Sequence, residues 1–133
     1  NRGIQFQNNS WNSITKLAAL YKKPIFVFAS KSNNLESMRM TEMMKSKTAG
    51  DYYNKRFICV QFNPDRAANA MKLHHWHVIK FPAIVFLDSK KRVISKAFGF
   101  MDEKRLNAEG ETVLKFIKTL EKNTPLVKHY GPS

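Results

Sequence analysis

Thiol chemistry is the first possibility that the side chains of this sequence raise, and one residue limits it. Cys59 is the single cysteine of the 133 residues, so neither an intrachain disulfide nor an all-cysteine metal cage can form. Because Cys59 lies inside the apolar run 57–62, we expect a buried, unreactive thiol rather than a nucleophile. Redox chemistry that needs two thiols of one chain is therefore excluded.

Two groups of possible metal ligands also call for interpretation. His74, His75 and His77 lie at the end of a predicted helix, but adjacent helical residues point about 100° apart and no cysteine or acid lies close in sequence. We interpret them as histidines favoured by the helix dipole. Methionines at helical spacing are interpreted as core residues rather than soft-metal ligands: Met38, Met40, Met43 and Met44. No metal and no cofactor is expected.

Charge is the strongest signal in the composition. Lysine and arginine outnumber acidic residues 23 to 10, which gives a formal net charge of +13 and favours an acidic partner. The basic residues are spread from Arg2 to Lys128, so we expect a solvated basic surface, and nucleic acid is an unlikely partner. Apolar runs are too short to span a membrane, and 43% hydrophobic residues suit one domain.

The hydrophobic pattern predicts a domain in which strands and helices alternate. Strands are expected at 3–7, 25–29, 57–62, 82–87 and 93–98, and helices at 11–21, 35–53, 67–76 and from 102 onward. The second helix should be interrupted near Ala49 and Gly50, Asp65 could cap the third, and Gly110 should break the last. We expect residues 1–123 to form the domain and 124–133 a C-terminal tail.

The fourth and fifth strands are expected to pair as a hairpin. Pro82 heads the fourth strand, since proline has no N–H to donate to a ladder, and the basic turn Lys90–Arg92 leads into the fifth. Earlier strands separated by helices should be parallel, with helices on both faces of the sheet. The prediction is an α/β fold with a mixed sheet.

This order, with a proline at the mouth of the fourth strand, resembles the thioredoxin fold. The resemblance is closest to a thioredoxin-like group with a Lys-Pro-Ile-Phe-Val strand, a Cys-x-x-Cys site followed by methionine, and a Pro-x-x-x-Phe-Leu-Asp strand. The matching residues here are Lys23–Val27, Met40 and Pro82–Asp88. The resemblance covers about residues 3–122 and implies a three-layer α/β/α sandwich with about five strands and about four helices.

The Cys-x-x-Cys position of that group holds no cysteine in this chain. Counted from Pro24 without gaps it falls on Asn34–Ser37, and with a two-residue shortening it falls on Ser32–Leu35. Thiol exchange requires a thiolate that attacks a disulfide, and neither serine nor asparagine can replace it. The strand 25–29 also lacks the buried acid that serves the buried thiol in the group. Dithiol oxidoreductase activity is therefore not expected.

What the resemblance preserves is a groove for an extended polypeptide. In the group, the residue before the strand-four proline pairs with a peptide through its main chain, and that proline is cis. The resemblance transfers these roles to Phe81 and Pro82, and it places Gly99 in the same groove. The candidate groove residues are Ser32, Asn34, Ser37, Phe81, Pro82 and Gly99.

Three functions follow as hypotheses. The first is a redox-inactive binding or structural module that holds an extended or acidic polypeptide. The second is a thiol enzyme, either monothiol or with Ser32 or Ser37 activating a thiol ligand at a helix start. The third is a basic surface for nucleic acid or another anionic partner, whose binding would weaken steeply with salt. Members of the group often act outside the cytoplasm, so the resemblance implies a periplasmic or secreted mature protein.

Overall fold

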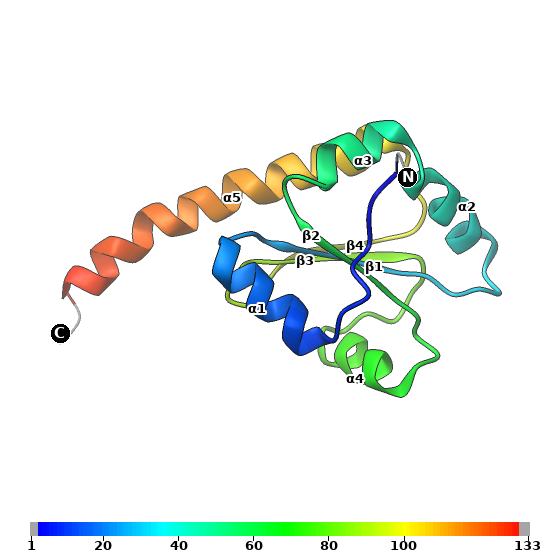
Figure 1. The fold of residues 1–133 in the computed structure, drawn as a ribbon, viewed down its shortest axis with the longest axis horizontal. Helices are drawn as coiled ribbons and strands as arrows, with labels where there is room; N and C mark the ends of the chain where they lie inside the picture. The colour runs from blue at the N-terminus through cyan, green and yellow to red at the C-terminus, as the bar shows by residue number, and fades with distance from the viewer. Residues whose placement is uncertain (1–2, 131–133) are drawn as a thin grey trace.

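The computed structural model describes the main chain of residues 3–130 and the side chains of residues 3–123. Five helices and four strands make up this described part, in the order α1 Trp11–Tyr21, β1 Ile25–Ala29, α2 Leu35–Met44, α3 Lys47–Tyr53, β2 Ile58–Phe62, α4 Ala67–His75, β3 Ala83–Leu87, β4 Val93–Phe98 and α5 Glu103–Tyr130. Figure 1 shows α2, α3 and α5 on one face of the sheet and α1 and α4 on the other. The expected three-layer α/β/α arrangement is confirmed.

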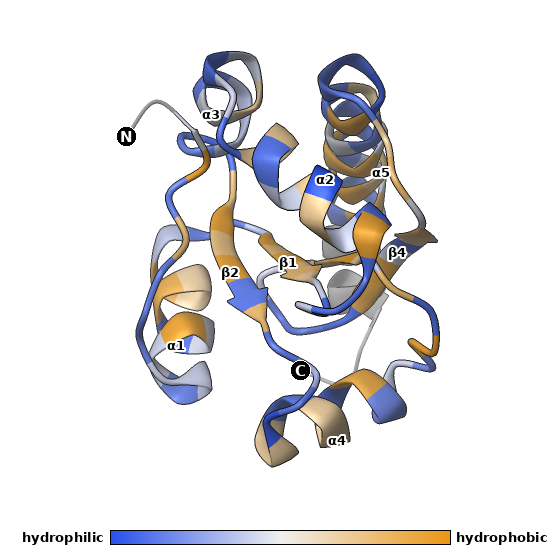
Figure 2. Ribbon diagram, turned by 90° about the vertical axis from the view of Figure 1, so that its right-hand side faces the viewer, coloured by the Kyte–Doolittle hydropathy of each residue, from blue (hydrophilic) through white to orange (hydrophobic). Residues whose placement is uncertain are grey.

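The sheet is mixed and has the order β2-β1-β3-β4. β1 is parallel to β2, whereas β3 is antiparallel to both β1 and β4. The two central strands are buried along their whole length, because alternate side chains enter the two cores on opposite faces. Figure 2 shows the apolar strand β1 between the helical layers. Burial on both faces explains why β1 is a continuous apolar run rather than an alternating one.

Short polar side chains set the starts of three helices. Ser10, Asn34 and Ser46 each accept a hydrogen bond from the main-chain N–H three residues on, as N-caps of α1, α2 and α3. The expected interruption near Ala49 and Gly50 is therefore wrong in position. The chain breaks at Lys45–Ser46, where the Ser46 cap starts α3, and Gly50 lies inside that helix.

The expected strand at residues 3–7 is not formed. Its main-chain donors take scattered partners: Ile4 N–H donates to Met44 O, Gln5 N–H to the Asn54 side chain, and Gln7 N–H to Cys59 O. One bond to β2 does not make a ladder, so the sheet has four strands among the described residues rather than about five. The alternating apolar side chains of Ile4 and Phe6 instead pack in the core.

Asp65 does not cap α4. The cap position is Arg66, and its side chain makes no capping hydrogen bond. The reason is local: Asn63 Oδ1 accepts the Asp65 N–H at 2.9 Å, a turn typical of asparagine. That turn holds Asp65 one residue before the cap.

The expected break at Gly110 is also wrong, because α5 runs continuously through it. A Cβ at Gly110 would lie 2.8 Å from Tyr53 Oη and 2.8 Å from Tyr52 Cε2. The glycine thus allows α5 to approach α3 closely. Tyr53 is fully buried and donates its hydroxyl hydrogen to Leu106 O.

Beyond the core, α5 continues as far as Tyr130, and its second half runs out past the sheet (Figure 1). The segment 124–130, expected as part of a tail, is thus helical, while residues 131–133 lie outside the described residues. The domain boundary at residue 123 stays a prediction. No helix in the described part of the chain is both long and apolar enough to cross a membrane.

Candidate functional site

The mouth of the β3–β4 hairpin brings three of the candidate residues together. The Phe81–Pro82 peptide bond is cis, and Pro82 O accepts a hydrogen bond from Gly99 N–H at 2.8 Å. Gly99 has a φ of +89°, in the region that favours glycine. Phe81 is half-buried, with its ring packed against the core beneath α1 and α4.

Phe81 has an unpaired main chain at this mouth. Its N–H and C=O make no hydrogen bond to another residue of the described part. Its ring faces the loop after β1, where Lys31 Nζ lies 5.4 Å from the ring centroid, within the range of a cation–π contact. The site therefore presents main-chain donor and acceptor groups beside a positive charge.

The ungapped Cys-x-x-Cys position, Asn34–Ser37, spans the start of α2. Asn34 Oδ1 accepts the Ser37 N–H at 2.8 Å. Ser37 is fully buried, and its hydroxyl oxygen accepts the Lys31 N–H at 3.1 Å. Both side chains thus stabilise the loop and the helix start. Since Ser37 is shielded from solvent, the geometry does not favour its activating a thiol ligand.

Glu36 connects the start of α2 to the chain after β4, and our sequence reasoning did not single it out. Its Oε1 accepts the Phe100 N–H at 3.1 Å. A Cβ at Gly99 would lie 3.7 Å from the same oxygen. Gly99 and the 34–37 turn are therefore neighbours. An acid in the first turn of a helix was the available signal, but its partner is 64 residues away in the sequence.

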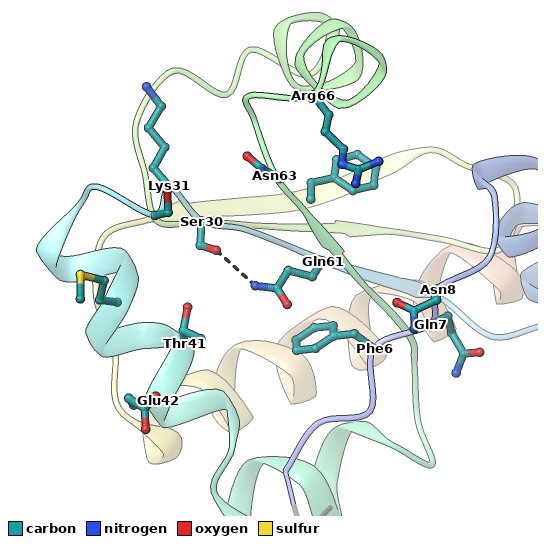
Figure 3. A pocket seen from close by; sticks show the side chains of 13 residues that line it. Phe6, Gln7, Asn8, Ser30, Lys31, Thr41, Glu42, Gln61, Asn63 and Arg66 are labelled. Carbon is teal, nitrogen blue, oxygen red and sulfur yellow. Dashed lines mark hydrogen bonds between the residues drawn. The ribbon is translucent and has the colours of Figure 1, made fainter.

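Ser32 lies on the wall of a cavity of about 620 Å³. The cavity shares the loop residues Ser30, Lys31 and Ser32 with the groove but none of Phe81, Pro82 or Gly99. Figure 3 shows its polar lining, in which Ser30 Oγ accepts a hydrogen bond from Gln61 Nε2 at 3.3 Å.

The position of this cavity follows from the sheet. Ser30 and Asn63 follow the parallel strands β1 and β2, and the carboxyl ends of parallel strands commonly form a crevice. The crevice could therefore have been located from the predicted ends of the two strands. Phe6 and Thr41 complete its wall from elements whose placement the sequence did not reveal.

Cys59 is buried in β2, as expected from its apolar run. Its side chain is 1% exposed, and its sulfur lies 3.8 Å from Phe57 O and 3.9 Å from Tyr53 O. Burial raises the pKa of the thiol to about 12, against a smaller opposite effect of Lys23. A thiol that stays protonated at neutral pH does not act as a nucleophile, so the geometry does not favour a monothiol enzyme.

Cys59 is expected to resist alkylation in the native protein. With a pKa of about 12, roughly one thiol in ten thousand is ionised at pH 8, against roughly one in four for an unperturbed cysteine. Labelling by iodoacetamide at pH 8 should therefore be slow and should become fast when urea unfolds the chain. Fast labelling of the folded protein, measured by intact mass, would contradict the buried placement.

The possible metal ligands are scattered among the described residues. No three histidine, cysteine, aspartate or glutamate side chains among them are grouped closely enough to hold a metal ion. His74 and His75 end α4, while His77 has a left-handed backbone with a φ of 61°.

The layers, the sheet order and the hairpin mouth define a thioredoxin-like fold, in a chain whose single cysteine cannot form a Cys-x-x-Cys pair. The sequence matches no family model and no curated protein. Among solved structures, the chain is similar to DsbH oxidoreductase, with 16% identity and a TM-score of 0.71 over 85% of each chain. It is also similar to a putative disulphide-isomerase from Bacteroides thetaiotaomicron, with 20% identity and a TM-score of 0.73 over 84% of this chain and 93% of that one.

The chain is similar as well to a thioredoxin from Thermus thermophilus, with 15% identity and a TM-score of 0.73 over 84% of this chain and 88% of that one. At such identities the likeness shows the fold alone, because one fold serves many functions.

Proposed function

We propose that this protein is a redox-inactive, thioredoxin-like binding module that holds an extended, acidic polypeptide in the groove of Phe81, Pro82, Gly99 and the 30–37 loop. The observation that carries the proposal is the unpaired main chain of Phe81, in a protein whose α2 start contains no thiol. An extended peptide can pair with such unpaired main-chain groups through hydrogen bonds alone. Binding therefore does not depend on the cysteines that exchange would require.

The net charge of the protein and the position of Lys31 favour an acidic chain. Lys31 lies over Phe81, and the carboxylate of Glu36 is already engaged by the Phe100 N–H. The whole protein carries a formal net charge of +13, which speeds the approach of acidic partners at low salt. Main-chain pairing should provide affinity, and Lys31 should provide the preference for acidic side chains.

Binding of an acidic, permanently unfolded polypeptide, carboxymethylated α-lactalbumin, tests the proposal. The Phe81→Ala variant removes the ring beside the pairing main chain, and Gly99→Ala adds a Cβ at a position with φ of +89°. Each should weaken binding by about tenfold, equivalent to about 1.4 kcal/mol. Isothermal titration calorimetry at physiological salt measures the effect.

Phe116→Ala is the matched control, because Phe116 is a phenylalanine on α5 with 49% exposure. It should bind like the wild type. If the wild-type protein does not bind, or if all three variants bind equally well, the groove is not the binding site. Circular dichroism confirms that each variant is folded before binding is measured.

A further inference from the structure

Both tryptophans of the chain line one hollow, which we call the tryptophan pocket. Its volume is about 510 Å³, and its principal lining residues are Trp11, Met71, Lys72, His75, Trp76 and Lys91. They come from α1, from α4 and its C-cap residue Trp76, and from the turn between β3 and β4. None of them belongs to the candidate groove, so the tryptophan pocket is a separate feature of the surface.

The aromatic wall of the tryptophan pocket is held rigidly by contacts from beneath. The Trp11 and Trp76 ring centroids are 5.6 Å apart at an interplanar angle of 57°. Phe62 stacks on Trp76 at 5.8 Å and 12° and meets Trp11 edge-on at 5.6 Å. By contrast, Met71 is 75% exposed, and methionine adapts its shape to a ligand. Rigid tryptophans beside an adaptable side chain are typical of an interaction hot spot.

The rim of the tryptophan pocket is positively charged. Lys72 Nζ lies 5.7 Å from the Trp11 ring centroid, Lys91 is exposed at the turn, and no acidic residue lines the pocket. Asp88 is the nearest acid along the chain to Lys91, but its side chain is 5% exposed and accepts a bond from Arg92 Nε at 2.6 Å. The two lysines of the rim therefore have no carboxylate partner in the pocket lining.

The segment that supplies most of the pocket lining has the same sign of charge. Between residues 66 and 96 the sequence contains a single acid, Asp88, and seven basic residues: Arg66, Lys72, Lys80, Lys90, Lys91, Arg92 and Lys96. An apolar hollow with a basic border fits a ligand that combines an apolar group with adjacent negative charge.

We propose that the tryptophan pocket binds an acidic peptide through one apolar anchor side chain. The anchor inserts beside Trp11, Trp76 and Met71, and carboxylates on either side of it pair with Lys72 and Lys91. Single-stranded nucleic acid fits less well, because it needs a basic track with several open stacking faces. Here Phe62 covers one face of Trp76, and Lys72 lies over Trp11.

Tryptophan fluorescence reports on this pocket directly, because the chain has two tryptophans and both line it. The probe is a synthetic peptide without tryptophan, in which one phenylalanine stands between two runs of glutamate. We expect a saturable change in emission on titration. A matched peptide with alanine in place of the phenylalanine should bind about tenfold more weakly, as expected for loss of one buried apolar side chain.

Two surface variants test the assignment of the residues. Met71→Ser removes the adaptable wall, Lys91→Glu reverses one rim charge, and each should weaken binding of the phenylalanine peptide by about tenfold. The matched controls are Met38→Ser, at a methionine with 54% exposure on α2, and Lys118→Glu, at an exposed lysine on α5. Both controls should bind within about twofold of the wild type.

Four results would overturn the proposal. The first is the absence of a saturable emission change, and the second is equal binding of the phenylalanine and alanine peptides. The third is a response to oligothymidylate but not to peptide, which would assign the surface to nucleic acid. The fourth is loss of peptide binding in Phe81→Ala with Met71→Ser unaffected, which would place the peptide in the groove instead. This last result would support the groove, so failure of the two proposals can be distinguished.

Discussion

The Asn34→Cys/Ser37→Cys variant is expected to catalyse reduction of insulin disulfides by dithiothreitol, while the wild-type protein leaves the reaction at its uncatalysed rate. Residue 34 caps α2 and residue 37 lies in its first turn, where main-chain N–H groups and the helix dipole lower the pKa of a thiol. A gain of at least about tenfold over the wild type is expected once an attacking and a resolving thiol are present.

Single variants and a second register separate the possible outcomes. Asn34→Cys alone and Ser37→Cys alone should stay inactive, because each lacks one of the two thiols. If the double variant is folded but inactive while Ser32→Cys/Leu35→Cys is active, the shortened register is correct instead. If the wild type is active and Cys59→Ser abolishes that activity, the protein is a monothiol enzyme and its proposed redox inactivity is wrong.

The Gly110→Ala variant is expected to unfold more easily than the wild type, although alanine is the better helix former. Helix propensity favours alanine by about 1 kcal/mol, whereas overpacking a core costs about 1 to 3 kcal/mol. The new Cβ would meet Tyr53 Oη at 2.8 Å. Tyr53 cannot move away easily, because it is fully buried and its hydroxyl is bonded to Leu106 O.

We expect a net loss of up to about 2 kcal/mol from the opposing effects of propensity and overpacking. Urea denaturation followed by circular dichroism measures it. A double-mutant cycle with Tyr53→Phe is the control, because removing the hydroxyl should recover part of the loss. If Gly110→Ala were more stable than the wild type, α5 and α3 would not be packed as closely as the structure places them.

The local sequence pattern was enough to predict those parts of the fold in which the residues favour one type of secondary structure. The run Ile25–Ala29 is apolar at every position and could only be a strand buried on both faces. The predicted helix break at Gly110 was wrong because a glycine can either end a helix or allow another helix to pack closely. Only the tyrosines of α3 decide between these roles. The predicted strand at residues 3–7 was wrong because alternating apolar and polar residues indicate the positions of side chains. They do not indicate the hydrogen-bond partners of the main chain.

Some parts of the candidate site could likewise be predicted from the sequence, and others could not. Pro82 and Gly99 flank paired strands in the sequence pattern, so their proximity followed from the hairpin. The tryptophan pocket did not follow, because Trp11 and Trp76 meet only once α1 and α4 lie on the same face of the sheet. Basic residues that are evenly spread along the chain likewise border one apolar hollow only after folding.

Asn34 and Ser37 make hydrogen bonds at the start of α2. Their chemistry determines the redox conditions under which the proposed binding module could work. A carrier that holds its client by thiol exchange gains and loses it as the surrounding glutathione pool shifts. The side chains of Asn34 and Ser37 contain no sulfur, so their hydrogen bonds are insensitive to that potential. Occupancy of the groove would follow client concentration alone, in an oxidising compartment and in a reducing one alike.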